Sequence, residues 1–173
     1  MAQRVPLKIE PLSEHHDRRT FSCGEAELDD YFRRRAGQDE RRNVARVFVA
    51  VSDDIGVAGF YSLSTCAINP GQLPEQIARK LPHYDTIPAA LIGRLARDLR
   101  ARGQGVGELL VADAIKRVLR ADRSMAIWAI LVDAKNQRAA DFYQRIGFTA
   151  FPSRPSRLFL PTATARKAAA ASG

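Results

Sequence analysis

Three glycines lie within the stretch Arg102-Gly103-Gln104-Gly105-Val106-Gly107 of this 173-residue chain. Because glycine has no Cβ, its backbone can approach a ligand closely, and several N–H groups of such a turn can point at one anion. The stretch lies between a predicted strand and a predicted helix, so the helix N-terminus would strengthen binding of a phosphate. A tight turn without a ligand is the alternative, because the stretch lacks both G-x-G-x-x-G spacing and the Lys-Ser/Thr of a Walker motif.

The acidic residues and histidines provide no obvious general base. Asp98 and Glu108 lie close to the glycine-rich stretch, but Asp98 can equally end a strand, and Glu108 suits the first turn of a helix. His15, His16 and His83 are candidates by residue type alone, and we expect them on the surface or in loops. The sequence therefore predicts an anion site without an evident base beside it.

The spacing of apolar residues predicts the elements that would position this site. A capping-box pattern at Ser22 predicts a first helix, and further helices are predicted after Gly107, from Asn136, and over residues 72–80. Short apolar runs predict strands over residues 44–51, 57–65, 89–98, 125–132, 148–151 and 158–160, the first two as an antiparallel hairpin. Strands and helices alternate in the second half, which predicts an α/β fold with a mixed sheet.

Length and composition favour one compact domain. The chain is 46% hydrophobic, enough to bury a core, and domains commonly contain about 100 to 150 residues. We expect this domain over residues 1–161, followed by a flexible, low-complexity tail over residues 162–173. There is no long apolar run and no signal core at the N-terminus, so we expect a cytoplasmic protein. Cys23 and Cys66 lack C-x-x-C spacing and predict free thiols, with no disulfide framework or metal site.

The charge of the chain is positive and unevenly distributed. Lys and Arg number 27 against 19 Asp and Glu, and the net charge of +8 favours an anionic partner. Residues 10–30 are net acidic, whereas residues 33–46 contain six arginines and two acids, and further basic groups lie at residues 94–102 and 154–167. One charge run is most often a solvated face, but several on one surface would bind nucleic acid through its phosphates.

The glycine-rich stretch resembles the pyrophosphate loop of the GNAT superfamily of acyl-CoA-dependent N-acetyltransferases. That loop has the form Arg/Gln-x-x-Gly-x-Gly/Ala after the fourth strand, and Arg102, Gly105 and Gly107 match it in the expected place. Five segments within residues 7–161 are also similar to the GNAT toxins of type II toxin–antitoxin modules. These segments are residues 21–31, 38–46, 92–96, 132–136 and 142–148.

This resemblance implies a fold, a reaction and partners. The fold would be a central mixed sheet flanked by helices. The reaction would move an acetyl group from acetyl-CoA to the free α-amino group of an aminoacyl-tRNA, which blocks translation. Toxins of this family are neutralised by a ribbon-helix-helix antitoxin, and operator DNA would be bound only through the complex with it. The family also implies a homodimer, without a metal and without a membrane partner.

The resemblance assigns roles to residues of the cofactor and acetyl-transfer site. Backbone amides near Leu95 and Ala96 would bind the acetyl carbonyl, which is the task of an oxyanion hole. Tyr143 would protonate the departing coenzyme A thiolate. The alternative for Leu95 and Tyr143 is a core position, and the alternative for Asn136 is a helix N-cap. The residues expected to contact the cofactor are Leu95, Ala96, Arg102, Gly103, Gln104, Gly105, Val106, Gly107, Asn136 and Phe142.

RNA contacts are expected from basic residues in three parts of the chain. Arg94 is the sharpest candidate, because residues 92–96 match a family segment whose arginine contacts the acceptor end. Arg97 departs from the family, which usually has an apolar residue there. It would change substrate or cofactor contacts if it faced the cleft, and would only add charge if it faced outward. The expected RNA-binding residues are Arg33, Arg34, Arg35, Arg42, Arg79, Lys80 and Arg94.

The residues leave other functions open. A free α-amino group has a pKa of about 7.7 to 8.0, so a substrate amine is partly neutral in the cell even without a general base. The acceptor could therefore also be a protein N-terminus or a small amine. A non-catalytic module that binds RNA, or operator DNA with its antitoxin, is the alternative of a different class. Loss of toxicity in a Tyr143→Phe variant would distinguish an enzyme from such a module.

Overall fold

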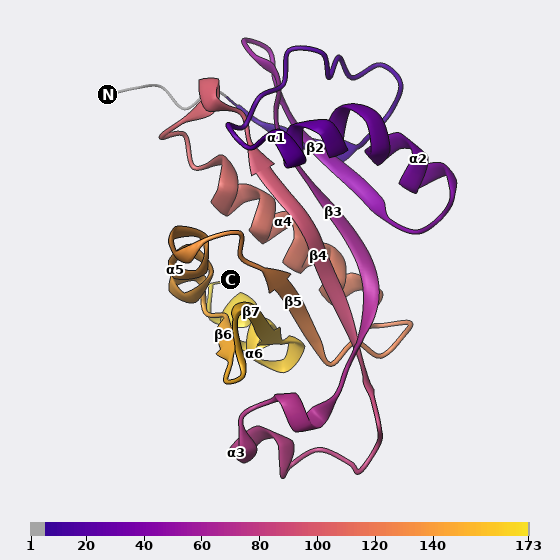
Figure 1. Ribbon diagram of the computed structural model, residues 1–173, viewed down its shortest axis with the longest axis vertical. Helices are drawn as coiled ribbons and strands as arrows, with labels where there is room; N and C mark the ends of the chain where they lie inside the picture. The colour runs from indigo at the N-terminus through magenta and orange to yellow at the C-terminus, as the bar shows by residue number, and fades with distance from the viewer. Residues whose placement is uncertain (1–5, 173) are drawn as a thin grey trace. The chain divides into compact units, whose positions relative to one another are not determined.

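The computed structural model describes residues 6–172 (Figure 1). Its strands are β1 (Lys8–Pro11), β2 (Arg46–Ser52), β3 (Gly56–Ile68), β4 (Ile87–Arg97), β5 (Ala129–Asp133), β6 (Thr149–Phe151) and β7 (Arg154–Pro161). Its longer helices are α4 (Val106–Ala121), α5 (Gln137–Ile146) and α6 (Thr162–Ala171). The shorter helical segments are α1 (Ala26–Asp30), the π-helix η1 (Tyr31–Arg35), α2 (Ala36–Arg41), η2 (Pro70–Gln72), α3 (Glu75–Ala78) and η3 (Leu99–Ala101).

Within these residues the strands form one seven-stranded sheet in the order β1-β2-β3-β4-β5-β7-β6. The β4–β5 pair is parallel, whereas the β1–β2, β2–β3, β5–β7 and β6–β7 pairs are antiparallel. The predicted hairpin of β2 and β3 is confirmed, with Val49 opposite Phe60. The α/β class with a mixed sheet is therefore confirmed.

The chain divides into two compact units. The first extends to Ser64 and resumes over Gly93–Ala114, and the second comprises Thr65–Ile92 and the chain from Ile115 onward. Strands β3 and β4 and helix α4 each contribute residues to both units. The single domain expected over residues 1–161 stays a prediction.

The first unit has an aromatic core between its helical run and its strands. The run from α1 to α2, indigo in Figure 1, contributes Phe32, and β3 contributes Phe60. These two rings stack at 4.3 Å between centroids, and Phe21 packs edge-on against Phe32 at 4.8 Å. Aromatic pairs of this kind contribute about 1 kcal/mol each beyond the apolar area they bury. The core thus fixes the helical run against the strands.

The helical run begins later than the capping-box pattern predicts. Helix α1 starts at Ala26, and Glu25 before it makes no side-chain cap. The Ser22 hydroxyl and the Cys23 N–H instead donate to the Asp29 carboxylate, at 3.4 and 2.8 Å. The predicted cap at Ser22 is wrong, because Gly24 has φ 90° and Glu25 is extended, so the helix cannot begin before Ala26.

The middle of this run is a π-helix, whose i→i+5 hydrogen bonds accommodate one more residue than an α-turn. Tyr31 and Phe32 are consecutive and both buried, while Arg33, Arg34 and Arg35 are all exposed. Single π-turns occur frequently at functional sites. Here the turn carries two buried aromatic residues and three adjacent exposed arginines.

The second unit differs from the sequence prediction in two places. Strand β5 begins at Ala129 rather than at Met125, whose side chain is 65% exposed. The short helix predicted over residues 72–80 is two separate turns, η2 and α3, because Leu73, the residue before Pro74, is extended with φ −80° and ψ 160°, as a following proline favours. The core of this unit contains Leu131 of β5 and Phe159 of β7.

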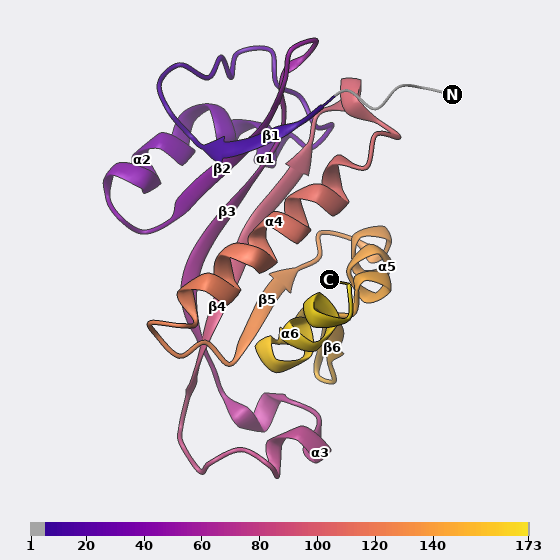
Figure 2. The same cartoon turned by 180° about the vertical axis from the view of Figure 1, so that it is seen from behind.

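The C-terminal residues form helix α6, yellow in Figure 2, where low complexity predicts an irregular tail. The buried Thr162 hydroxyl donates to the Ile127 carbonyl at 2.7 Å, and Arg166 pairs with Asp122. Alanine has the highest helix propensity of all residues. The alanine-rich composition therefore favours a helix once Thr162 anchors its first turn, which corrects the prediction of a tail after Pro161.

Candidate functional site

The glycine-rich stretch forms a tight turn that leads into α4. Gly103 and Gly105 have φ values of 75° and 71°, a conformation that residues with a Cβ rarely adopt. Helix α4 begins at Val106, and the Leu109 N–H donates to the Gly105 carbonyl at 3.1 Å. The N–H groups of the first helical turn have no partner within a helix. The turn therefore presents an anion site at the N-terminus of a 16-residue helix.

One buried atom of this turn lacks a partner. No donor among residues 6–172 reaches Oε1 of Gln104, although this atom is buried. An unpaired buried acceptor costs about 1–3 kcal/mol, and an N–H group of a ligand would remove that cost. Coenzyme A carries phosphates for the helix N-terminus and amide N–H groups for Gln104. The residues of the turn thus fit acyl-CoA, with Arg102 exposed beside them and Gly107 in the first helical turn.

The expected acetyl-binding residues lie near the end of β4. The parallel pairing of β4 with β5 covers Ala89–Ile92, and β4 itself continues to Arg97. Leu95 and Ala96 follow the paired stretch, with Ala96 buried in the core of the first unit and Leu95 half-buried. The Ala96 side chain is thus part of the core, whereas Leu95, for which a core position is the alternative, is only half-buried. The role of their backbone amides stays a prediction.

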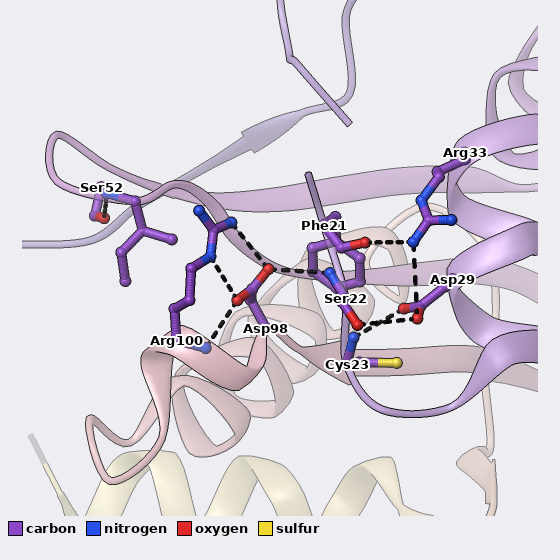
Figure 3. A network of polar contacts seen from close by, with 9 residues as sticks. Phe21, Ser22, Cys23, Asp29, Arg33, Ser52, Asp98 and Arg100 are labelled. Atoms are coloured by element: carbon purple, nitrogen blue, oxygen red, sulfur yellow. Dashed lines mark hydrogen bonds and ion pairs between the residues drawn. The ribbon is translucent and has the colours of Figure 1, made fainter. Parts of the chain in front are cut away.

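Asp98, directly after β4, is held by four N–H groups (Figure 3). Its carboxylate accepts the backbone N–H of Ser22 at 3.1 Å and the backbone N–H of Arg100 at 2.8 Å. The Arg100 guanidinium adds hydrogen bonds from Nε at 2.9 Å and from Nη2 at 3.0 Å. Burial alone would raise the pKa of Asp98, but the hydrogen bonds from Arg100 and Ser22 lower it below its usual value. Asp98 is thus a structural anion and is poorly suited to act as a general base.

The same network continues to the helical run (Figure 3). Arg33 donates to the Phe21 carbonyl at 2.7 Å, and its guanidinium lies 3.9 Å from Asp29. Asp29 accepts the Cys23 N–H, as described above. Residues 21–23 are therefore fixed at one side by the residue that follows β4 and at the other side by α1 and η1.

Tyr143 lies on α5 in the second unit and is 6% exposed. The centroid of the Tyr143 ring lies 5.2 Å from that of the Phe142 ring and 5.7 Å from that of the Phe148 ring, and both pairs pack edge-on. No residue in the described range forms a hydrogen bond with the Tyr143 hydroxyl. Burial raises the pKa of Tyr143 to about 12. The phenol is consequently protonated throughout the physiological range and can act as a proton donor.

Asn136 acts as the N-cap of α5. Its side-chain oxygen accepts the Ala139 N–H at 2.9 Å, so the capping interpretation is confirmed. The side-chain NH2 group is not used by this cap and can still bind a ligand. Gly147 ends the same helix with φ 127°.

Arg97, the departure from the family pattern, is half-buried at the last position of β4. Its Nε is buried and has no hydrogen-bond partner within the described residues. A buried donor of this kind is available to a ligand acceptor.

Residues 43–150 match the Acetyltransferase (GNAT) domain family, which covers more than half of the chain. The chain belongs to the GNAT acetyltransferase family. The glycine turn lies directly before α4, and Tyr143 lies on α5; their roles in catalysis and cofactor binding stay predictions. This GNAT chain is therefore an acetyltransferase that uses acetyl-CoA.

Two relatives of this GNAT chain cover nearly its whole length. A probable toxin TacT of Sinorhizobium fredii is 36% identical over 167 residues, which are 91% of this chain and 92% of the relative. A tRNA-acetylating toxin of Mycobacterium tuberculosis is 37% identical over 155 residues, 90% of this chain and 92% of the relative.

Solved structures agree with these relatives. AtaT complexed with acetyl-methionyl-tRNAfMet matches with a TM-score of 0.86 and 30% identity, covering 94% of this chain and 99% of AtaT. AtaTR bound with acetyl-CoA matches with a TM-score of 0.81 and 30% identity, at 94% and 97% coverage. A mutant AtaT bound to the C-terminus of the antitoxin AtaR matches with a TM-score of 0.79 and 28% identity, at 94% and 97% coverage.

The basic residues expected to bind RNA differ in how exposed they are and in whether their side chains already have a partner in this GNAT chain. Arg34 is 80% exposed in an ion pair with Asp30 at 3.2 Å, and Arg42 is exposed directly after α2. The Arg35 guanidinium lies 5.6 Å from the centroid of the Tyr31 ring. Arg33 is partly committed to the Phe21 carbonyl.

Arg94 and the two basic residues of the second unit complete the set. The backbone N–H of Arg94 donates to Ser62 Oγ at 3.0 Å, and its guanidinium stacks on Tyr31 at 3.9 Å. In the second unit, Arg79 pairs with Glu75 at 2.6 Å, and Lys80 is exposed beside it.

Tyr31 and Ser62 are the residues near Arg94 that the sequence did not single out. Tyr31 is in the core of the first unit, and its hydroxyl donates to Asp39 at 3.0 Å. Neither position carries a motif that would have revealed the contact. Within residues 6–172, no three His, Cys, Asp or Glu side chains cluster to hold a metal, and no helix is long and apolar enough to cross a membrane.

Proposed function

We propose that this GNAT chain transfers the acetyl group of acetyl-CoA to the α-amino group of an aminoacyl-tRNA and thereby blocks translation. The observation that carries the proposal is the near full-length similarity to AtaT, whose structure contains acetyl-methionyl-tRNAfMet. The relative from Mycobacterium tuberculosis, a tRNA-acetylating toxin, supports the same substrate.

The cofactor would be bound by the glycine turn and α5. Backbone N–H groups of residues 102–107 would bind the pyrophosphate, and Asn136 and Phe142 would line the pantetheine arm. The thioester supplies the activated acetyl group. N–H groups near Leu95 and Ala96 would bind the acetyl oxygen and stabilise the negative charge that develops on it.

Acetyl transfer would proceed by direct attack. The neutral α-amino nitrogen forms a bond to the acetyl carbon, and the bond from that carbon to sulfur breaks. Tyr143 gives its proton to the departing thiolate, and the excess proton of the amine passes to water. No strong base is needed, because an α-amino group with a pKa of about 7.7 to 8.0 is partly neutral at cellular pH.

The acceptor RNA would be bound by basic side chains. Arg94 would contact the acceptor end, because its segment matches the family segment with that role. The remaining contacts would neutralise phosphates, which supply most of the sequence-independent affinity for nucleic acid. These residues are Arg33, Arg34, Arg35, Arg42, Arg79 and Lys80.

A ribbon-helix-helix antitoxin would neutralise the enzyme, and operator DNA would be bound only through that complex. The structure of AtaT with the C-terminus of the antitoxin AtaR supports an antitoxin partner. We further propose a homodimer that acts in the cytoplasm, where aminoacyl-tRNA is present.

The test is incubation with labelled acetyl-CoA, charged tRNA and a panel of peptides. We expect label on the aminoacyl group of charged tRNA and none on uncharged tRNA. Label on peptides alone would refute the assigned substrate. The Tyr143→Phe variant provides the inactive control.

A further inference from the structure

Two arginines of the first unit converge on the surface of α2 at Gly37. A Cβ built on Gly37 would lie 3.3 Å from Nη1 of Arg41 and 3.6 Å from Nη2 of Arg18. Both guanidinium groups therefore approach one point that glycine leaves open.

The Arg18 guanidinium is fixed in this position. Its Nη1 donates to the Phe32 carbonyl at 2.8 Å, and the guanidinium lies 5.8 Å from the centroid of the Phe32 ring. Burial and the positive charge of Arg41 lower the pKa of Arg18. Two like charges are thus held together, although their repulsion disfavours the arrangement.

No carboxylate of residues 6–172 forms an ion pair with Arg18 or Arg41. The acids close to them in sequence have other partners, which removes the internal sources of compensating charge. Asp17 pairs with Arg19 at 3.0 Å, Asp39 accepts the Tyr31 hydroxyl, and Glu40 binds Arg46 and the Val47 N–H.

We propose that Arg18 and Arg41 form a phosphate-binding site for the RNA backbone. Guanidinium groups present planar pairs of N–H donors that match phosphate oxygens, and a phosphodiester between them would offset their repulsion. The exposed arginines on the same helical run and directly after it, Arg34, Arg35 and Arg42, favour RNA as the source of the phosphate. The inference rests on the proposed tRNA substrate and adds to it a contact that the family resemblance does not assign.

The main test uses Arg41→Gln in the full-length protein. Binding of charged tRNA is measured by fluorescence anisotropy at several salt concentrations. We expect affinity to fall on the order of 3- to 10-fold, and the slope of log affinity against log salt to decrease by about one. Arg19→Gln is the matched control, because Arg19 is 89% exposed and already paired with Asp17. It should retain the wild-type slope.

Gly37→Ala tests the same site without removing a charge. Alanine is the better helix former, so thermal stability should be retained. Its methyl group would press on Arg41 Nη1, and we expect the same loss of salt slope as in Arg41→Gln. Wild-type slopes in both variants would overturn the inference.

Two other outcomes assign the pair to a different ligand and also overturn the inference. One is a raised KM for acetyl-CoA with an unchanged salt slope, which would indicate coenzyme A phosphates. The other is weaker antitoxin binding with unchanged tRNA binding. If the wild-type protein binds charged tRNA with an Arg41-dependent slope but does not acetylate it, the proposed function fails while the phosphate site stands.

Discussion

The guanidinium of Arg94 lies 3.9 Å from the centroid of the Tyr31 ring. Tyr31 is 1% exposed and is held by its hydrogen bond to Asp39, while the backbone of Arg94 is held by Ser62. Arg94 is consequently restrained both at its backbone and at its charged end. A cation over a desolvated ring gains about 2 kcal/mol. Tyr31 is therefore a positioning residue for the arginine proposed to contact the acceptor end.

Replacing Tyr31 with Leu should raise the KM for charged tRNA about 3- to 10-fold, because the ring under Arg94 is lost. Tyr31→Phe keeps the ring and should stay close to wild type. In an Arg94→Ala background the Tyr31→Leu change should have no further effect on this KM. Steady-state kinetics with charged tRNA provide the measurement. Equal losses in the Phe and Leu variants would argue against a role of the ring.

Tyr143→Phe should lower kcat about 10²- to 10⁴-fold with little change in the KM of either substrate, because only a proton donor is lost. Since the pKa of Tyr143 is about 12, its deprotonation should not limit the wild-type reaction below about pH 10. Activity should rise as the substrate amine deprotonates near pH 8 and then remain level. A fall in kcat between pH 8 and 9 would contradict this assignment.

Asp98→Ala should destabilise the protein by about 3 kcal/mol, because the Ser22 and Arg100 N–H groups lose their shared acceptor. The native pKa of Asp98 is below its ordinary value of 3.8, so its contribution to stability is present above that pH and is lost as the pH falls further. The difference between the variant and wild type in urea unfolding should thus shrink below about pH 4. Asp53→Ala, in the exposed turn after β2, is the control and should unfold like wild type.

Gly105→Ala should raise the KM for acetyl-CoA about tenfold, because a Cβ strains the left-handed backbone that presents the anion site. Gly56→Ala is a matched control, since Gly56 has φ 79° at the start of β3, directly after a hairpin turn outside the site. The control should lose comparable stability in a thermal melt and keep the wild-type KM. An equal rise in KM for both variants would indicate a general effect of backbone strain.

Alkaline pH should destabilise the protein through two buried phenols. Burial raises the pKa of both Tyr31 and Tyr143 to about 12, from an ordinary value of 10.0. A raised native pKa means that the stabilisation is complete below about pH 10 and is lost as the pH rises toward 12. Thermal melts across this range should show the fall, and Tyr143→Phe should reduce it. A melting temperature constant from pH 10 to 12 would disprove the linkage.

Local sequence patterns correctly predicted those features of the fold that depend on the backbone conformation of neighbouring residues. The hairpin of β2 and β3, the turn at Gly103 and Gly105, and the Asn136 cap each follow from neighbouring residues. Contacts between distant residues were not predictable in this way. The Ser22 pattern failed because the chain leaves helical conformation at Gly24, and periodicity gave no sign that Asp98 binds Ser22 from 76 positions away.

The arginines show the same division. The positions of the arginines along the sequence were enough to locate the basic stretch that follows residue 30. Which of these arginines stay available depends on tertiary partners, since Arg33 binds the Phe21 carbonyl while Arg34 is paired with its helical neighbour Asp30. The Tyr31 ring lies under the Arg94 guanidinium, and Gly37 leaves room for the guanidinium groups of Arg18 and Arg41. Neither Tyr31 nor Gly37 is charged itself.

The π-turn at Tyr31–Arg35 holds one residue more than an α-turn, so this segment contains a surplus residue. Deletion of one exposed arginine from the turn would let it relax to an α-helix, and Ala36 and Arg41 would stay close to their present faces. Helix α2 has no such surplus. Because an α-helix advances about 100° per residue, deletion of Gln38 would rotate Arg41 by that angle, away from the face that it shares with Arg18. The length of the chain is therefore adjustable in the π-turn and fixed in α2.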